Sequence, residues 1–234
     1  MAEQTDVIID GKTYTGYLGE SLLELALRHK IDIPLLCYEP RKPCLGTCRV
    51  CTIKWKRHFV AACSLTITEG MDLSIDTPEL HDVRKGIIEL LFVEGNHFCP
   101  SCEKSGNCFL QAQAYHHGMT APRFHYRFSQ KSLDFRCKKI VFDQNRCIYC
   151  KRCVLHFKDK DHRQVIAFKY RGRHLELKLN VERIDRLDDK EVDELVDLCP
   201  VGALLKKGRG FRDPIGNRRF DENEVSLEDY LGES

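Results

Sequence analysis

The sequence lacks the features that would place it in several common functional classes. No apolar run is long enough to span a membrane, and residues 1–10 are mixed polar and carry acids, unlike a signal peptide. The 37 Lys and Arg residues nearly balance the 35 Asp and Glu residues, so no charge excess favours nucleic acid or anionic lipid. No G-x-G-x-x-G fingerprint is present. We therefore expect a cytoplasmic protein with no membrane span, no nucleic-acid partner and no dinucleotide site of its own.

Cysteine, in contrast, is abundant, with 13 residues in a chain of 234. The count is odd, so a complete disulfide framework would leave one thiol over. The cysteines are also bunched at x2 spacing, which suits a compact inorganic cluster better than disulfides between distant elements. Twelve positions form three sets of four, each with the spacing of an iron–sulfur ligand group. Three such sites in one chain predict a conducting path for electrons.

The first set is predicted to hold a [2Fe-2S] cluster. Its ligands are Cys37, Cys48, Cys51 and Cys63. A loop supplies three ligands and a later segment supplies the fourth, as in plant-type ferredoxins. Gly46 in the loop would allow peptide N–H groups to approach the cluster sulfur atoms. Zinc is less favoured because it prefers two closely spaced pairs, and only one CxxC occurs here. Cys44 is a possible replacement for Cys37 or Cys48, but the spacing favours a spare thiol.

The second set combines one histidine with three cysteines and is predicted to hold a [4Fe-4S] cluster. Its ligands are His97, Cys99, Cys102 and Cys108. A neutral imidazole in place of a thiolate makes the site less negative, which should raise its reduction potential. His116 and His117 lie nearby in the sequence and compete with His97 for the role of fourth ligand.

The third set is also predicted to hold a [4Fe-4S] cluster. Its ligands are Cys147, Cys150, Cys153 and Cys199. This is half of the bacterial two-cluster ferredoxin pattern. Phe157 stands where the fourth Cys of the run would ligate a second cluster, so that second cluster is expected to be lost. Cys137 falls outside every set and is expected to be a small buried hydrophobic residue.

Apolar periodicity and turn residues predict an α+β protein. Expected strands cover 7–9, 12–15, 52–56, 60–62, 73–75, 139–142, 165–170 and 174–179, and expected helices cover 21–30, 78–92, 108–117 and 191–198. Asp10-Gly11 is a hairpin turn and Ser21 is a helix N-cap. The order of the first elements is typical of a β-grasp domain.

We predict four parts. These are a β-grasp [2Fe-2S] domain (1–77), a small helical His/Cys3 [4Fe-4S] domain with a basic and aromatic linker (78–130), a ferredoxin-like [4Fe-4S] domain (131–208), and a C-terminal tail (209–234). From Lys206 onward the composition is rich in Gly, Arg and acids. This composition predicts a segment without a core of its own, suited to docking on a partner.

Three motifs resemble a known family. They are Cys37-Tyr38-Glu39-Pro40 with Gly46-Thr47-Cys48-Arg49-Val50-Cys51, the run from Cys99 to Cys108, and Cys199-Pro200-Val201-Gly202. The chain resembles the N-terminal part of the large iron–sulfur subunit of respiratory complex I. Its length, the lost ferredoxin cluster and the tail make it most similar to the small iron–sulfur subunit in the diaphorase half of soluble NAD-reducing [NiFe] hydrogenases. One departure is that the complex I pattern has its ligand His where this chain has Gly95.

The resemblance implies an electron-transfer subunit that carries no catalytic site itself. Its implied partners are a flavin- and NAD-binding diaphorase subunit and the small and large [NiFe] hydrogenase subunits. The reaction served would be hydrogen oxidation coupled to NAD⁺ reduction. The alternative is the equivalent subunit of an NAD-linked formate dehydrogenase or another complex I-like enzyme. An iron-only hydrogenase is less favoured because its catalytic domain needs further Cys motifs.

Overall fold

The computed structural model describes residues 3–40, 44, 46–128 and 130–230. It divides into two compact units. The first contains residues 1–89, 113–123 and 225–234, and the second contains residues 90–112 and 124–224. The outermost residues of the predicted first domain (1–2) and tail (231–234) lie outside the described residues. The four-part division stays a prediction.

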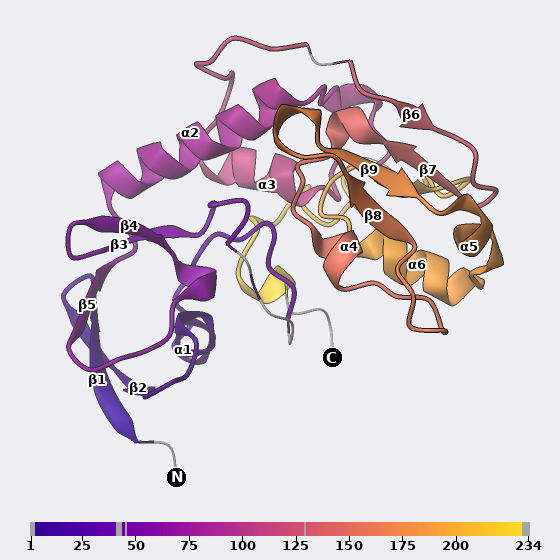
Figure 1. Cartoon of the computed structure of the whole chain (residues 1–234). Coiled ribbons are helices and arrows are strands. Elements are labelled where there is room, and N and C mark those ends of the chain that lie inside the picture. Colours follow the sequence, from indigo (N-terminus) through magenta and orange to yellow (C-terminus); the bar gives the residue numbers. More distant parts are fainter. Residues whose placement is uncertain (1–2, 41–43, 45, 129, 231–234) are drawn as a thin grey trace. The chain divides into compact units, whose positions relative to one another are not determined.

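The first unit is built on a five-stranded mixed sheet with the order β2-β1-β5-β3-β4 (Figure 1). Its strands are β1 (Gln4–Ile9), β2 (Lys12–Tyr17), β3 (Thr52–Trp55), β4 (His58–Ala61) and β5 (Met71–Ser74). β1 and β5 run parallel, and the other neighbours are antiparallel. Helix α1 (Leu22–Arg28) follows the first hairpin. This confirms the predicted two-iron ferredoxin fold with its β-grasp order.

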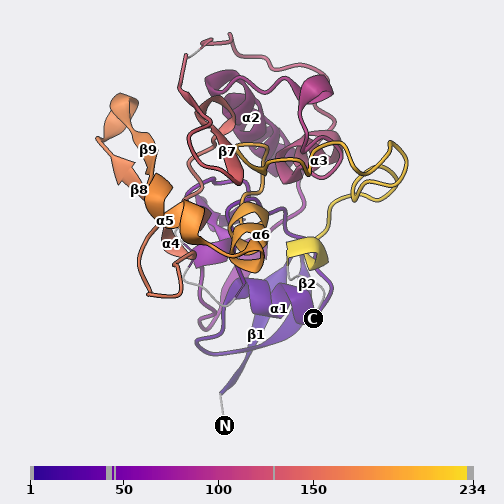
Figure 2. The same ribbon diagram turned by 90° about the vertical axis from the view of Figure 1, so that its right-hand side faces the viewer.

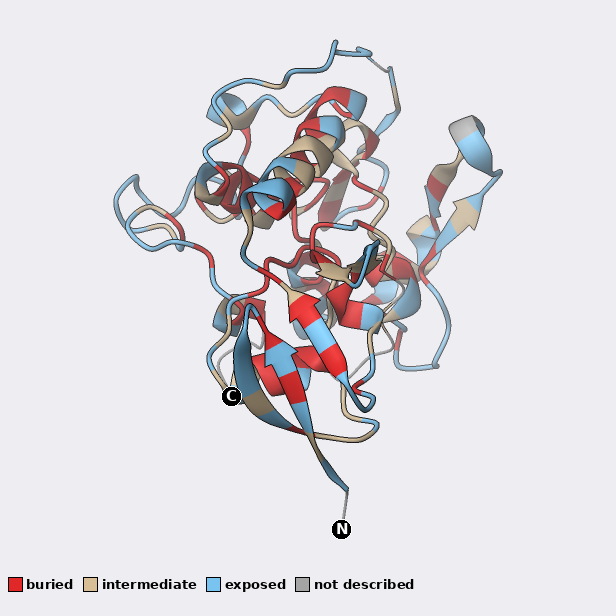
Figure 3. Ribbon diagram, turned by 90° about the vertical axis from the view of Figure 1, so that its left-hand side faces the viewer, coloured by how far each residue is buried: buried red, intermediate tan, exposed pale blue. Residues whose placement is uncertain are grey.

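Local chemistry explains how these elements form. Ser21 accepts the backbone N–H of Glu24, whose side chain accepts the Ser21 N–H, so the predicted N-cap is a full capping box. Val7 and Ile9 alternate with exposed neighbours, which gives β1 one buried face (Figure 3). Leu25 packs closely on Gly16 of β2, where a Cβ atom would lie 2.9 Å from its Cδ1. The helix therefore approaches the sheet where β2 has no side chain.

Two helices contribute residues to both units. These are α2 (Pro78–Glu94) and α3 (Phe109–His116), with a short 3₁₀ turn, Cys99–Ser101, between them. Both helices were predicted, the first over 78–92 from its apolar spacing and the second over 108–117 after the ligand loop. Among the described residues, no helix has the length and apolar character needed to cross a membrane.

The second unit combines a three-stranded antiparallel sheet, of order β10-β7-β6, with a separate β8–β9 hairpin. The hairpin and the helices after it can be followed in Figure 2. Its elements are β6 (Leu133–Asp134), β7 (Ile140–Asp143), α4 (Arg152–Leu155), β8 (Ile166–Lys169), β9 (Glu176–Leu179), α5 (Val181–Arg186), α6 (Asp189–Asp197) and β10 (Leu204–Lys206). The prediction missed β6, β10, α4 and α5. These elements have two to six residues, too few to show a period.

The chain after Lys206 is predicted to have no core of its own, and its later part is held by contacts with residues of the two units. In the second unit, the Arg218 guanidinium binds Asp221 and donates to the Ser105 carbonyl, and the Phe220 N–H donates to the Gly106 carbonyl. In the first unit, the Tyr230 hydroxyl donates to the Leu35 carbonyl and is buried. Isolated apolar residues in a charged segment show no pattern in the sequence. Phe220, Val225, Leu227 and Tyr230 are buried, whereas Phe211 and Ile215 are exposed. Partner docking by this tail stays a prediction.

Candidate iron–sulfur sites

The first predicted set comes together at one end of the β-grasp sheet. Cys51 directly precedes β3, and Cys63 lies in a 3₁₀ turn (Ala62–Ser64) directly after β4. Because β3 and β4 are antiparallel neighbours, the start of one lies beside the end of the other. The Cys51 carbonyl accepts the N–H of Ala62 at 3.1 Å. Strand pairing therefore closes the sequence gap between these two cysteines.

The remaining thiols of the first set join them. Hydrogen bonds from the thiols of Cys44, Cys48 and Cys63 lower the pKa of Cys37, and a hydrogen bond between Cys63 and Cys51 lowers the pKa of Cys51. All four predicted ligands are buried. Backbone N–H groups also point at these sulfur atoms, those of Cys48 and Val50 among them. Such donors are the expected stabilisers of a negatively charged cluster.

Cys44 is closer to this site than a spare thiol would be. Hydrogen bonding to Cys37 raises the pKa of the Cys44 thiol to about 11, and Cys44 also interacts with Cys63. The spacing between Cys44 and Cys48 fits no standard ligand pattern, so the sequence predicted a spare thiol. Gly46, two residues after Cys44, has a φ of +59°, a backbone conformation that favours glycine.

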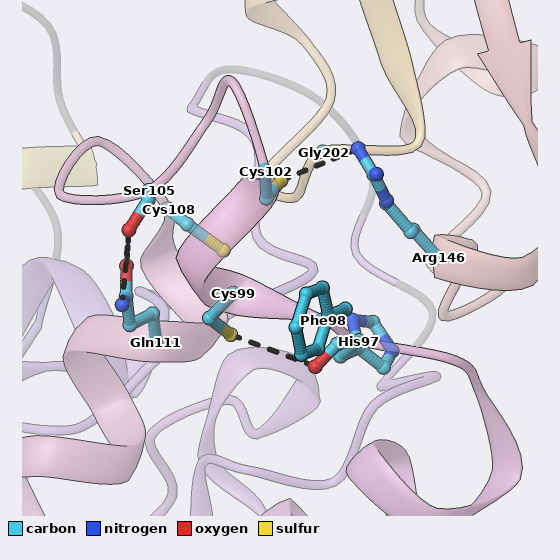
Figure 4. A pocket seen from close by; sticks show the side chains of 9 residues that line it. All are labelled: His97, Phe98, Cys99, Cys102, Ser105, Cys108, Gln111, Arg146 and Gly202. Atoms are coloured by element: carbon cyan, nitrogen blue, oxygen red, sulfur yellow. Dashed lines mark hydrogen bonds between the residues drawn. The ribbon is translucent and has the colours of Figure 1, made fainter.

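The three cysteines of the second set line one cavity (Figure 4). Its lining is completed by His97, Phe98, Ser105, Gln111, Arg146 and Gly202. Burial raises the pKa of Cys108 to about 12. The Gln111 carbonyl oxygen accepts the Gly106 N–H at 2.8 Å, which fixes the loop between the second and third cysteines. Cys102 has no room beside it, because a Cβ atom at Gly202 would lie 2.4 Å from its Sγ.

His97 has the form of a metal-ligating histidine. Burial lowers the pKa of its ring to about 4, so the imidazole is neutral. Its ring is hydrogen-bonded to the backbone of Leu91, and its Nε2 is buried with no partner among the described residues. One nitrogen held by a carbonyl and the other left available is the usual arrangement of a ligand histidine. His116 and His117 belong to the first unit, so neither lines this cavity.

The position of the His97 ring also explains the departure at Gly95. A Cβ atom on Gly95 would lie 2.5 Å from the His97 Nε2. The ring thus occupies the space where a side chain at position 95 would begin. This is the position at which the complex I pattern has its histidine. In this chain, a side chain at position 95 would therefore overlap the His97 ring.

The third set is closed by strand pairing across a long gap. Cys147 follows β7 and its short 3₁₀ turn, Gln144–Arg146, whereas Cys199 precedes β10. β7 and β10 are antiparallel, so the end of the first lies beside the start of the second. Burial raises the pKa of Cys147 to about 12, and the Cys150, Cys153 and Cys199 thiols all interact electrostatically. The four predicted ligands therefore share one site.

The loop of the third set is shaped by left-handed residues. Tyr149 and Lys151 have φ angles of 52° and 69°, which is uncommon for residues with side chains. The Tyr149 N–H donates to the Cys147 Sγ at 3.4 Å. Its hydroxyl donates to the Leu175 carbonyl at 3.0 Å and thus holds the strained turn in place. The strain is therefore used to direct a backbone donor at a ligand sulfur.

The two predicted four-iron sites are neighbours within the second unit. Arg146, next to Cys147 in the chain, donates from Nη1 to the Cys102 Sγ at 3.4 Å (Figure 4). The N–H of Phe109, next to Cys108, donates to the carbonyl of Pro200 at 3.0 Å. The second set is thus hydrogen-bonded to a residue next to Cys147, and the residues next to Cys108 and Cys199 are hydrogen-bonded to each other. Sequence spacing had no means of showing this.

The donor sets fit iron–sulfur clusters. All 13 cysteines are free thiols, and a thiol that binds a metal gives up its proton. Iron supplies that charge, and the surrounding N–H groups supply the hydrogen bonds to sulfur. Among the described residues, no three His, Cys, Asp or Glu side chains are arranged to hold a single metal ion. Cys137 is fully buried, as predicted.

Three families match consecutive parts of the chain. Residues 2–78 match the 2Fe-2S iron–sulfur cluster binding domain, residues 84–123 match the NADH-ubiquinone oxidoreductase-G iron–sulfur binding region, and residues 137–205 match the ferredoxin-like domain of NADH-quinone oxidoreductase subunit 3. Fold and family matches together define an α+β iron–sulfur protein. It carries one [2Fe-2S] and two [4Fe-4S] clusters, as predicted.

The relatives identify the family more closely. The chain is 42% identical over 228 residues to the gamma subunit of the NAD-reducing hydrogenase HoxS of Cupriavidus necator, covering 97% of both chains. It is similar to a chain of the crystal structure of an NAD⁺-reducing [NiFe] hydrogenase in the H₂-reduced state, with a TM-score of 0.87, 35% identity and coverage of 97% of this chain and 99% of that one. The chain belongs to the family of NAD-reducing hydrogenase gamma subunits, which confirms the resemblance.

A more distant relationship joins the chain to complex I. It is 28% identical over 213 residues to the mitochondrial 78 kDa subunit of NADH-ubiquinone oxidoreductase of Candida albicans. The match covers 89% of this chain but 29% of that protein. The chain therefore corresponds to a minority of the complex I protein, and the remaining part of that protein has no counterpart here.

Proposed function

We propose that this chain is the electron-transfer subunit of an NAD-reducing [NiFe] hydrogenase. It relays electrons between a [NiFe] hydrogenase module and a flavin- and NAD-binding diaphorase subunit, in the reaction that couples H₂ oxidation to NAD⁺ reduction. Near full-length similarity to a gamma subunit of this enzyme class supports the role most strongly. The proposed partners are the diaphorase subunit and the small and large hydrogenase subunits. Free thiols throughout suit a cytoplasmic location.

The ligand assignment is part of the proposal. Cys37, Cys48, Cys51 and Cys63 would hold the [2Fe-2S] cluster. His97, Cys99, Cys102 and Cys108 would hold one [4Fe-4S] cluster, and Cys147, Cys150, Cys153 and Cys199 would hold the other. Bound clusters supply one-electron transfer. The chain supplies ligands, burial and directed N–H groups, which set the reduction potentials.

The arrangement of the second unit supports a relay. Hydrogen bonds through Arg146 and Phe109 connect the surroundings of its two four-iron sites. A protein that only stored iron or used it structurally would gain nothing from adjacent redox sites. A complex I-type role is less favoured, because the chain is 28% identical to the 78 kDa protein and 42% identical to the hydrogenase protein.

The decisive experiment measures iron and acid-labile sulfide in anaerobically purified protein and follows EPR during stepwise reduction. About ten irons and ten sulfides per chain, with one two-iron and two four-iron signals, are expected from the cluster types. About six irons and six sulfides per chain would mean that one four-iron cluster is absent, and the His97 set would be the first site to examine. Zinc without sulfide would refute electron transfer. Affinity purification of the chain should also recover a flavoprotein and a nickel protein, and the complex should reduce NAD⁺ with H₂.

A further inference from the structure

Arg84 is a buried cation in the first unit. It lies on α2 one turn from Leu80 and one turn from Ile88, and all three side chains belong to the buried stripe of the helix. The arginine residue is 3% exposed. An arginine remains charged at any accessible pH, so this position places a full positive charge among apolar neighbours.

No carboxylate neutralises this charge within the described part of the chain. The Arg84 Nε donates to the carbonyl of Thr52 at 2.9 Å, while its Nη2 is buried without a partner. Of the carboxylates on the same helix, Glu79 pairs with Lys54, and Asp82 and Glu89 both pair with Arg123. A buried charge without a counter-ion is strongly unfavourable. The burial of Arg84 therefore calls for another source of negative charge close to its guanidinium.

The neighbours that approach Arg84 from α3 and the following turn do not supply negative charge. His117 is buried, and both its ring nitrogens lack partners. Burial lowers the pKa of His117 to about 3, so the ring is neutral. His81, Lys85 and His116 are the other titratable groups around this ring, and none carries negative charge.

Negative charge is available on the other side, at the first thiol set. The carbonyl that Arg84 binds belongs to Thr52, the residue directly after Cys51. Burial lowers the pKa of Arg84, and the Cys51 thiol, followed by Asp76, Asp32 and Asp10, opposes this lowering. Once the four thiols ligate iron they are thiolates, and the ligated cluster carries net negative charge that increases on reduction.

We propose that Arg84 is the built-in counter-ion of the [2Fe-2S] cluster and raises its reduction potential by stabilising the charge added on reduction. The proposal rests on the first thiol set holding that cluster. Arg84 acts as a positioning residue, because it reaches the site through the Thr52 carbonyl and its charge. Through Arg84, helix α2, which begins after the predicted β-grasp domain, would tune a cluster whose ligands all lie outside the helix.

The test is an EPR-monitored redox titration of the two-iron signal in the complete hydrogenase complex. The variants are Arg84→Gln and Arg84→Lys. Lys85→Gln is the matched control, because it removes one charge from the next position of the same helix, where the Lys85 Nζ donates to the Gly118 carbonyl. We expect Arg84→Gln to reduce the equilibrium constant for cluster reduction about tenfold, which lowers a one-electron potential by about 59 mV. Arg84→Lys and Lys85→Gln should shift it much less.

The outcomes separate this inference from the proposed function. Absence of a two-iron signal in the unaltered complex would refute the function and the inference together. A normal signal whose potential moves equally in Arg84→Gln and Lys85→Gln would overturn only the inference. If Arg84→Gln fails to assemble, Arg84→Lys decides the matter. Lysine keeps the positive charge. If the two-iron potential in Arg84→Lys falls as far as expected for Arg84→Gln, the positive charge does not set this potential and the inference is wrong.

Discussion

Replacing Arg146 by Gln should lower the reduction potential of the four-iron cluster assigned to the His97 set. In the native protein, the Arg146 Nη1 lies 3.4 Å from the Cys102 Sγ and 3.2 Å from a Glu103 carboxylate oxygen. Its Nε lies 3.0 Å from Asp143. The substitution removes a charged donor from a ligand sulfur and leaves two carboxylates without their partner. Both changes make the surroundings more negative and disfavour the added electron.

The magnitude follows from the hydrogen bond. A hydrogen bond to a charged group contributes about 1.5–3 kcal/mol. The reduction potential depends only on how much stronger this hydrogen bond is in the reduced cluster than in the oxidised cluster. We take this difference as roughly half of the bond's free energy, or about 1 kcal/mol. One-electron potentials change by 59 mV per factor of ten, so the expected fall is about 40 mV. The carboxylates on Arg146 already offset part of its charge, which keeps the value modest.

The assay is an EPR redox titration that resolves the two four-iron signals. Lys104→Gln is the matched control because it removes a charge from the same ligand loop, between Cys102 and Cys108. The signal of the His97 set should fall in Arg146→Gln and remain nearly constant in Lys104→Gln. Equal shifts in the two variants, or a rise in Arg146→Gln, would refute the reasoning.

Three further predictions concern the ligand sites. His97→Cys should lower the potential of its four-iron cluster, because a thiolate adds negative charge where the imidazole was neutral; EPR titration measures this. Gly202→Ala should lose iron from the same site and cost about 1–3 kcal/mol of stability by overpacking, because the new methyl group would overlap the Cys102 Sγ; iron analysis and thermal melting measure this. Cys44→Ala should leave the two-iron signal unchanged, whereas Cys37→Ala should retain a two-iron signal with altered g-values because Cys44 lies close enough to replace the lost ligand.

Each of these predictions has a contrary result. An unchanged potential and spectrum in His97→Cys would show that His97 is not a ligand. Gly86→Ala is the control for Gly202→Ala, since its Cβ atom would meet only the Arg123 Nη2, at 3.4 Å. Equal iron loss in both glycine variants would remove the steric argument. For the two-iron site, a cluster that survives Cys63→Ala as well would show that the assignment of its ligands is wrong.

The sequence determined the chemistry and the class of each site. Ligand type and short-range spacing are local properties, so the CxxC pairs and the Cys199-Pro200 dipeptide were readable without a fold. The same is true of the Ser21 capping box and the long helix α2, whose signals lie within a few neighbouring residues. The α+β architecture and the three clusters followed from these local signals and from the family resemblance.

Tertiary structure alone decided what lies beside each ligand. The pairing of β7 with β10 closes the gap before Cys199, and the interactions of Cys44 with Cys37 and Cys63 place it at the first site. Arg84 had one weak signal in the sequence, a charged residue at helical spacing on an apolar stripe. Arg146 had none, because its contact with Cys102 spans 44 residues. Spacing fixes which atoms bind iron, but potentials depend on charges and hydrogen bonds through space, and only folding sets those distances.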